Sequence, residues 1–336
     1  MKKILISDPT LRDGNHAVAH QLNADNFAKY CNAADAAGIP IVEVGHGNGL
    51  GASTILVGEA KLSDEQILTI SRENLKNSKL GVLAVPGFCT IKKHLTQAVE
   101  LGVDVFRVAS HCTEANVTQR HIEFVRNAGK TAYGVLLMSH MASPAKLVEE
   151  AQKMAAYGAE SVIIFDSSGY YLPEDVTERI TALTNGLDIP VGFHGHNNLG
   201  MAVMNSVAAV RAGATIIEGT TRGFGAGAGN TQLEVLVAVF KRLGWDTGID
   251  LYKVLDLAQL AEREFNPVPA SINPLAIVSG LAGVFSGFAR LVDKTAKEYN
   301  IDPRDIFFEL GKRNAVAGQE ALIAEVARDL AKACPK

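Results

Sequence analysis

Short apolar runs rich in valine and isoleucine alternate with longer amphipathic segments over the first two thirds of the chain. The eight runs are Ile4–Ser7, Ile41–Gly45, Leu80–Val85, Val105–Ser110, Thr131–Met138, Ser161–Asp166, Val191–His196 and Thr215–Thr220. Because they are apolar on both faces, they are typical of strands in a parallel sheet that helices cover. Eight strand–helix units in a row predict an α/β protein with a closed (β/α)8 TIM barrel, and a doubly wound open sheet is the main alternative.

The segments between these runs carry helix signals. Ser63 and Gln66 resemble a capping box that opens a helix near residues 64–75. Residues 144–157 place apolar side chains on one stripe, as a helix that packs on the sheet requires. Glycines just ahead of the next strand are typical of helix ends, and they are Gly38, Gly102, Gly158 and Gly213.

The strand–helix rhythm stops after Trp245. A helix is expected over Asp250–Glu264, followed by a stiff connection at Pro267–Pro269. Further helices are expected over Leu275–Asp293, Lys294–Tyr299, Pro303–Gly311 and Gln319–Ala333. We therefore expect a catalytic barrel over residues 1–264 and a C-terminal helical subdomain over 265–336. The Gly- and Ala-rich stretch Ser279–Ala289 permits close helix contacts, and we expect it to cover part of the barrel mouth.

Composition excludes several classes of protein. The 336 residues include 32 Lys and Arg against 36 Asp and Glu, which gives a net charge of −4. This balance lacks the excess of positive charge that is typical of proteins that bind nucleic acid or an anionic membrane. The N-terminus lacks a signal-peptide core, and prolines interrupt the long uncharged stretch Pro267–Ala289, which argues against a membrane span. The cysteines are scattered and predict reduced thiols, and they are Cys31, Cys89, Cys112 and Cys334. These features predict a cytoplasmic protein.

Polar residues gather where the predicted strands end, and this end of a (β/α)8 barrel carries the active site. In chain order they are Asp8, Arg12, Asp13, His16, Glu43, His46, Asn48, Ser110, His111, Ser139, His140, Asp166, Ser167, His194, His196, Glu218 and Thr220. Random surface polarity would scatter such residues over both ends of the barrel. We therefore expect the functional site at the carboxyl ends of the strands.

His194 and His196 form the sharpest local motif. Side chains at positions i and i+2 of a strand point to the same face, so both imidazoles can face the barrel mouth. Asp13 could complete a two-histidine, one-carboxylate set for a divalent cation such as Mn²⁺, Mg²⁺, Co²⁺ or Fe²⁺, with zinc left open. The plainer alternatives are hydrogen-bonded pocket histidines, a capping role for Asp13, a surface ion pair for Arg12 and a loop histidine at His16.

A glycine-rich run, Gly223–Thr231, follows the eighth predicted strand. Backbone N–H groups at the start of a helix attract anions, so the run could be a phosphate cradle. It lacks the Lys-Ser/Thr ending of a nucleotide loop, which disfavours nucleotide binding. Close approach of the backbone to the site, with Asn230 aimed at the metal ligands, fits better.

These motifs resemble the DRE-TIM metallolyase superfamily and, within it, the 4-hydroxy-2-oxoacid (4-hydroxy-2-oxovalerate) aldolases. The resemblance covers nearly the whole chain, and its stretches are SDPTLRDGNHAVAHQ, EVGHGNGLGAS, PGFCT, FDSSG, FHGHNNLG, RGFGAGAGNTQLE and AVAGQEALIAEVARDL. The Arg-Asp-Gly and His-x-His elements are common to the superfamily. The position of His16, the HGNGLGAS stretch and the helical tail favour the aldolase branch.

The resemblance implies roles for single residues. Asp13, His194 and His196 would be the metal ligands, Arg12 would lie beside the metal and His16 would be the catalytic base. The substrate would lie against Arg12, Asp13, Ser167, His194 and Phe285. At the last of these positions the family usually has a tyrosine, and a phenylalanine cannot donate a hydrogen bond. Tyr170 and Tyr171 are the replacements that we consider for that hydroxyl.

The resemblance also implies the reaction and the partners. The expected activity is a class II aldolase reaction that needs a divalent metal ion, Mn²⁺ before Mg²⁺ or Co²⁺, and cleaves 4-hydroxy-2-oxoacids to pyruvate and a short aldehyde. A Claisen-type acyl-CoA lyase or acyltransferase of the same superfamily is the alternative, and a non-catalytic barrel is a weaker one. The expected partners are an acylating acetaldehyde dehydrogenase, bound through the C-terminal helices, and a second copy of the chain in a homodimer.

Overall fold

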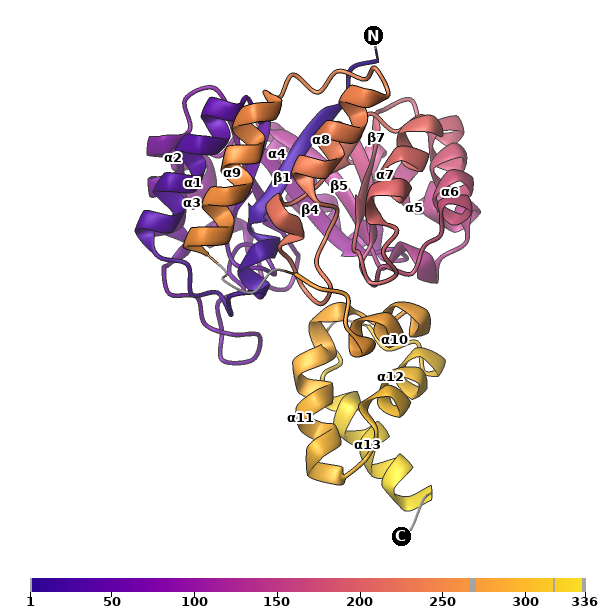
Figure 1. The fold of residues 1–336 in the computed structure, drawn as a ribbon. Helices are drawn as coiled ribbons and strands as arrows, with labels where there is room; N and C mark the ends of the chain where they lie inside the picture. Colours follow the sequence, from indigo (N-terminus) through magenta and orange to yellow (C-terminus); the bar gives the residue numbers. More distant parts are fainter. Residues whose placement is uncertain (1, 266–269, 317, 334–336) are drawn as a thin grey trace.

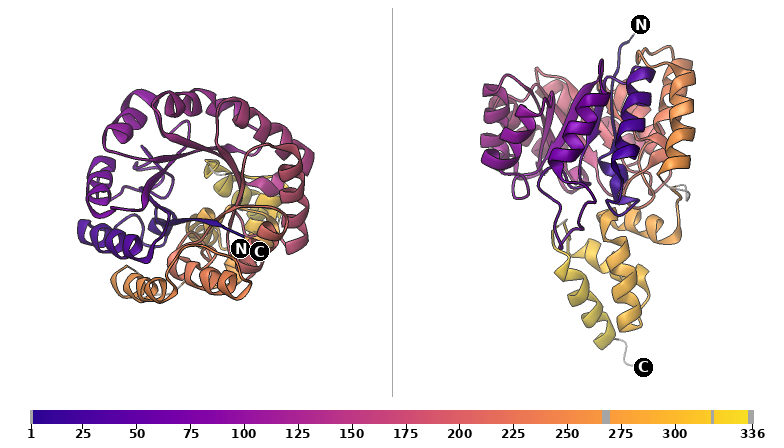
Figure 2. Two further views of the ribbon diagram at one scale, coloured as in Figure 1. Left: turned by 90° about the horizontal axis from the view of Figure 1, so that it is seen from above. Right: turned by 90° about the vertical axis from the view of Figure 1, so that its left-hand side faces the viewer.

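The computed structural model describes residues 2–265, 270–316 and 318–333. Eight parallel strands close a barrel in the order β1 to β8, and β8 pairs with β1. The helices between the strands form a ring around the barrel, which Figure 2 shows along the barrel axis (Figures 1 and 2). The predicted (β/α)8 barrel is therefore confirmed, and the open sheet is wrong.

The elements fall close to their predicted positions. The strands are β1 (Leu5–Leu11), β2 (Ile41–Val44), β3 (Lys79–Ala84), β4 (Val105–His111), β5 (Thr131–Leu137), β6 (Ser161–Asp166), β7 (Val191–Gly195) and β8 (Ile216–Glu218). The barrel helices are α1 (Ala24–Ala37), α2 (Asp64–Asn74), α3 (Thr96–Glu100), α4 (Gln119–Asn127), α5 (Pro144–Ala156), α6 (Pro173–Gly186), α7 (Ala202–Arg211), α8 (Leu233–Arg242) and α9 (Leu251–Glu264).

The helix signals in the sequence act as expected. Ser63 and Gln66 form a reciprocal capping box at the start of α2. On α5 the predicted apolar stripe is buried against the barrel. Gly38, Gly102, Gly158 and Gly213 all have positive φ, the backbone region that glycine enters without steric cost.

Strand alternation sorts the barrel side chains into two sets. In β4, Phe106 and Val108 belong to the core shared with the outer helices, whereas Val105 and Ala109 belong to a separate cluster inside the barrel. Arg107 shares the inward phase of this strand and is fully buried. The barrel interior therefore contains charged as well as apolar side chains.

The C-terminal helices lie at the end of the barrel opposite the N-terminus (Figure 1). They are α10 (Pro274–Ala282), α11 (Ala289–Tyr299), α12 (Pro303–Lys312) and α13 (Ala321–Ala333), and a 3-10 turn, η6 (Ser286–Phe288), precedes α11. Their buried side chains, which include Val284, Phe288 and Phe307, form a hydrophobic cluster of their own. This separate core supports the predicted division of the chain, whose boundary near residue 264 stays a prediction.

The prediction of one helix over Leu275–Asp293 is wrong. Gly283 has a φ of 65° and ends α10, because a left-handed residue stops the helical hydrogen-bond pattern. The helix α11 then runs without a break through the segment Lys294–Tyr299, which was predicted as a separate helix. The expected stiff connection at Pro267–Pro269 lies outside the described residues.

The structure bears on two further expectations, namely the membrane span and the state of the cysteines. Within the described ranges, no helix is both long and apolar enough to cross a membrane. Cys31, Cys89 and Cys112 are buried free thiols, while Cys334 lies outside the described part of the chain.

Candidate metal centre and substrate pocket

A pocket of about 470 Å³ lies at the carboxyl ends of the strands. Its polar wall includes Arg12, Asp13, His16, Ser167 and His196. The apolar lining includes Leu56, Val57, Leu83, Val85, Pro86, Phe88, Leu137, Phe165, Phe285 and Val316. Residues of the barrel and of the segments between the C-terminal helices thus meet in one pocket, and Phe285 belongs to the stretch Ser279–Ala289 that we expected there.

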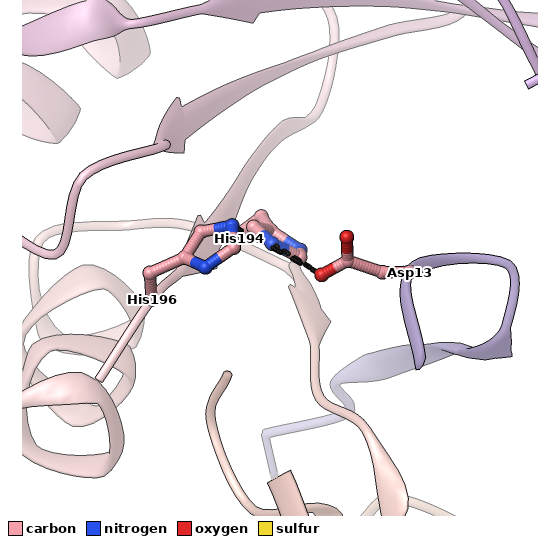
Figure 3. Close-up of side chains that lie close together, drawn as sticks. All are labelled: Asp13, His194 and His196. Carbon is pink, nitrogen blue, oxygen red and sulfur yellow. Dashed lines mark ion pairs between the residues drawn. The ribbon is translucent and has the colours of Figure 1, made fainter. Parts of the chain in front are cut away.

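Three potential ligands converge beside this pocket. Asp13 opens the 3-10 turn η1 (Asp13–His16) after β1, His194 lies in β7, and His196 follows that strand directly. Asp13 Oδ2 lies 3.9 Å from His194 Nε2 and 4.0 Å from His196 Nε2, and Figure 3 shows the three side chains turned toward one another. One ligand atom from each residue lies within 4.8 Å of the others.

The chemistry of this set suits a divalent cation. His194 Nε2 is buried and has no hydrogen-bond partner among the described residues, so an electron pair faces Asp13 unused. Burial would raise the pKa of Asp13, but the nearby positive charge of Arg12 holds it well below its usual range. Burial lowers the pKa of His196 to about 3. The ionised carboxylate of Asp13 and the neutral imidazole of His196 are in the protonation states that metal ligation needs.

Glu218, in β8, fixes the orientation of one of these ligands. Its Oε2 lies 2.9 Å from His194 Nδ1, and both side chains are buried. A carboxylate at Nδ1 favours the tautomer with the proton on that nitrogen, which leaves the Nε2 electron pair for a cation. The ring of His194 also stacks on Phe165, with 4.2 Å between the ring centroids.

A chain of buried charges runs beneath the metal centre. The guanidinium of Arg107 donates to Glu43 and to Glu218, and Glu43 in turn accepts from Nε of Arg12. The positively charged side chain of Arg107 therefore bonds to two carboxylates. Of these, Glu43 also bonds to Arg12, and Glu218 also bonds to His194. Sequence analysis missed Arg107, although a charged residue in the middle of an apolar strand was a signal that could have found it.

The guanidinium of Arg12 is held on one side and free on the other. Its Nη1 donates to Asp13 Oδ1 at 3.1 Å and to the Gly47 carbonyl at 3.2 Å. Its Nη2 is buried without a hydrogen-bond partner among the described residues. The alternative of a surface ion pair is therefore wrong, and a rigid donor remains for an oxygen in the pocket.

His16 faces the same pocket from η1. Its Nε2 lies 3.9 Å from Asp13 Oδ1, and its ring makes an edge contact with His20 at 5.1 Å between centroids. The ring lies so close to Gly47 that a β-carbon at that position would overlap it. Burial lowers the pKa of His16 to about 4, so the imidazole is neutral near pH 7.

The expected substrate-contacting residues differ in their position. Ser167 lines the pocket, and its hydroxyl accepts a hydrogen bond from the Met138 amide at 3.0 Å. Phe285 also lines the pocket, from the segment between α10 and η6. Tyr170 and Tyr171 are absent from the described lining, and the Tyr171 hydroxyl lies 2.9 Å from that of Ser139. They do not replace the missing tyrosine.

The glycine-rich loop approaches the metal centre as expected. A β-carbon on Gly225 would lie 2.9 Å from Asp13 Oδ2. Asn230 donates from Nδ2 to the same carboxylate oxygen and, at 3.1 Å, to the Phe224 carbonyl. The loop thus holds Asp13 from the side opposite Arg12.

Other polar residues at the strand ends have structural contacts. Asp166 accepts hydrogen bonds from the amides of Tyr170 and Tyr171 at 2.9 and 3.1 Å and is buried. His46 stacks on His20, with 3.7 Å between the centroids, and its Nε2 lies 3.0 Å from the Gly58 carbonyl. These residues shape the loops around the pocket and are not part of the ligand set.

Two family models together match most of the chain. Residues 3–261 match the HMGL-like family, and residues 270–332 match the DmpG-like communication domain. The chain is 72% identical over 331 residues to a 4-hydroxy-2-oxovalerate aldolase of Pectobacterium atrosepticum, with 98% of this chain and 96% of that protein covered. It is 60% identical over 327 residues to a 4-hydroxy-2-oxovalerate aldolase of Spirochaeta aurantia, covering 97% of this chain and 96% of that protein.

A solved structure shows the same fold at much lower identity. The carboxyl transferase domain of Rhizobium etli pyruvate carboxylase, solved with pyruvate and biocytin, superposes with a TM-score of 0.83 at 16% identity. The match covers 99% of this chain and 61% of that one. This likeness concerns the arrangement of the barrel and the helices that follow it.

Proposed function

Since this chain belongs to the family of 4-hydroxy-2-oxovalerate aldolases, we propose that its barrel mouth binds one divalent ion on Asp13, His194 and His196 and holds the substrate against it. The activity is that of a carbon–carbon lyase, which cleaves 4-hydroxy-2-oxoacids to pyruvate and a short aldehyde. The observation that carries the proposed site is the convergence of these three side chains, with an unused imidazole nitrogen facing the carboxylate.

Asp13, His194 and His196 would hold the ion, which would supply Lewis-acid chemistry by polarising the 2-oxo group of the substrate. Mixed nitrogen and oxygen ligation suits Mn²⁺, which we propose as the ion, with Mg²⁺ or Co²⁺ as alternatives. Glu218 keeps His194 oriented for ligation through Nδ1.

Arg12 stabilises the negative charge that develops on the 2-oxo oxygen. Its Nη2 is the donor without a partner, and the bonds of Nε and Nη1 hold the guanidinium in place before the substrate arrives. A donor fixed in advance stabilises a developing oxyanion more than one that must reorient. A permanently charged guanidinium also stays a donor at any working pH.

His16 takes the proton from the 4-hydroxyl group. Its lowered pKa leaves the imidazole neutral and ready to accept. As the hydroxyl becomes the aldehyde carbonyl, the C3–C4 bond breaks and its electron pair forms the pyruvate enolate. Protonation at C3 then gives pyruvate, and no lysine or Schiff base is required.

In this proposal Ser167 and Phe285 complete the substrate pocket beside Arg12 and Asp13. His194 is not among the described lining residues, and we propose that it approaches the substrate as a ligand of the ion. The Ser167 hydroxyl already accepts from Met138, and its own proton remains for a substrate oxygen. The phenyl ring of Phe285 contributes an apolar surface only, so any hydrogen bond that a tyrosine would make at this position is lost.

The match of residues 270–332 to a communication domain supports association with another protein. We propose that this protein is an acylating acetaldehyde dehydrogenase, which would take over the volatile aldehyde. A homodimer and a cytoplasmic location stay predictions, as does the division of the chain into a catalytic barrel over residues 1–264 and a helical subdomain over 265–336.

The direct test is a panel of 4-hydroxy-2-oxoacids of different chain length, assayed with Mn²⁺, Mg²⁺ and Co²⁺ and read out as pyruvate. We expect pyruvate release that depends on the added ion, with 4-hydroxy-2-oxopentanoate among the substrates. Condensation of acetyl-CoA with an oxoacid, without pyruvate release from any member of the panel, would favour the Claisen-type alternative, which the relatives' names do not favour.

A further inference from the structure

The buried side-chain amide of Asn198 joins the barrel to the C-terminal helices. Asn198 lies two residues after His196 and is fully buried. Its Nδ2 donates to the Ala276 carbonyl of α10 at 3.0 Å, and its Oδ1 accepts from the Ser286 hydroxyl of η6 at 3.1 Å. The loop that follows the proposed metal ligand His196 is therefore hydrogen-bonded to α10 and to η6, which lie much later in the chain.

Glycines allow this joint to close tightly. A β-carbon on Gly169 would lie 2.6 Å from the backbone nitrogen of Asn198, and one on Gly280 would lie 2.9 Å from Asn198 Cβ. A β-carbon on Gly227, in the loop that approaches Asp13, would lie 2.6 Å from Ser286 Cβ. Since real side chains do not tolerate such distances, the surrounding backbones come together only because these residues are glycines.

The joint lies directly beside the pocket. Ser286 follows Phe285, whose side chain lines the pocket together with Asp13, His16 and His196. A second contact between the same two parts of the chain is made by His140, whose Nε2 lies 2.9 Å from the Gly283 carbonyl. The segment that carries Phe285 is thus held by the barrel on both sides, at Gly283 and at Ser286.

We propose that Asn198 and Ser286 are positioning residues that hold Phe285 in the substrate pocket and so set the shape of its apolar wall. This assignment rests on the aldolase function proposed above, and it adds two residues that touch neither the substrate nor the metal ion. Because the hydrogen bond is buried, its loss leaves a polar atom unpaired, and the segment shifts to satisfy it. Substrate binding should respond more than the chemical step.

The test compares Ser286→Ala with Thr118→Val. The Thr118 hydroxyl is equally buried and donates to the Ala115 carbonyl at 2.6 Å, so its loss removes a hydrogen bond of the same kind in a barrel loop outside the segment that carries Phe285. With 4-hydroxy-2-oxopentanoate as substrate, Ser286→Ala should raise KM about threefold to tenfold and leave kcat and the Mn²⁺ dissociation constant within about twofold. Thr118→Val should leave KM unchanged.

A double-mutant cycle links the effect to the hydrogen bond. If Asn198 and Ser286 act through one contact, Ser286→Ala should have no further effect on KM in an Asn198→Ala background. Equal KM shifts in the Ser286→Ala and Thr118→Val variants, or full additivity in the cycle, would overturn the proposal. Circular dichroism and thermal unfolding show that each variant is folded. Absence of pyruvate release by the wild-type enzyme would instead reject the proposed function.

Discussion

The ring of His16 lies between Gly47 and His20 and faces the pocket without belonging to the proposed ligand set. Its position was predictable because it follows Arg12 and Asp13 in one short motif. Its protonation state was not predictable, since burial lowers the pKa to about 4 and sequence spacing says nothing of burial. A neutral imidazole at this place is what the role of a base requires.

Replacement of this base should affect turnover and spare metal binding. We expect His16→Ala to lower kcat by about 10²–10⁴-fold, with the Mn²⁺ dissociation constant unchanged, because the imidazole is the proposed base and is not one of the proposed metal ligands. Steady-state pyruvate release and calorimetric Mn²⁺ titration measure the two quantities. His121→Ala is the control, since this imidazole bonds to the Cys89 carbonyl at 2.8 Å and lies outside the pocket. An unchanged kcat in His16→Ala would reject the role.

The contact between Glu218 and His194 could not be predicted from the sequence. Glu218 was recognised as a polar residue at a strand end, but its contact with His194 depends on how β7 and β8 are aligned across the closed barrel. The same holds for Arg107, which bonds to residues from two other strands. Contacts between strands far apart in sequence follow from barrel register, which hydrophobic patterning does not specify.

The carboxylate of Glu218 should strengthen metal binding without touching the ion. Glu218→Gln removes the charge that supports His194, so we expect the Mn²⁺ dissociation constant to rise about 10- to 100-fold. Glu234→Gln removes a similarly buried carboxyl group that bonds to the Arg222 amide, and it should leave the constant unchanged. Equal affinities of the Glu218→Gln variant and the wild type for Mn²⁺ would contradict this supporting role.

At the scale of the elements, strand positions were predictable to within a few residues because parallel strands are buried on both faces and appear as apolar runs. The break between α10 and α11 was not, because an apolar sequence rich in glycine and alanine looks helical throughout. Only the left-handed backbone of Gly283 ends the first helix. The loop after β8 was predicted more successfully, since its repeated glycines indicated close backbone approach.

That loop supports Asp13 through a glycine without space for a side chain. Gly225→Ala would place a methyl group 2.9 Å from Asp13 Oδ2 and closer still to Asn230 Nδ2, so the hydrogen-bonded pair of Asn230 and Asp13 must move. We expect kcat/KM to fall about 10²-fold, because a shift on the order of 1 Å at a reacting centre has such an effect. Gly129→Ala, at a left-handed position with open space, should reduce thermal stability and leave kcat/KM unchanged. Wild-type kinetics of Gly225→Ala would show that the loop does not hold Asp13.

At the scale of the whole molecule, the chain combines a barrel with a second hydrophobic core and joins them at the pocket. The number of strand–helix units predicted the barrel, and the end of that rhythm after Trp245 predicted the helices that follow. How the two parts meet was not predictable, because the joint at Asn198 depends on buried side-chain hydrogen bonds between distant segments. The proposed metal centre lies close to this joint. The roles that we propose for Arg12, His16 and Glu218 all depend on an ion bound at that centre.

The most direct test of that centre is an anomalous difference map from crystals of the enzyme grown with Mn²⁺, recorded at the manganese absorption edge. We expect one strong peak between the Asp13 carboxylate and the imidazoles of His194 and His196, at bonding distance from all three, and no such peak in crystals of Asp13→Ala. A map without a peak there, recorded from crystals that retain Mn²⁺-dependent activity when dissolved, would contradict this expectation.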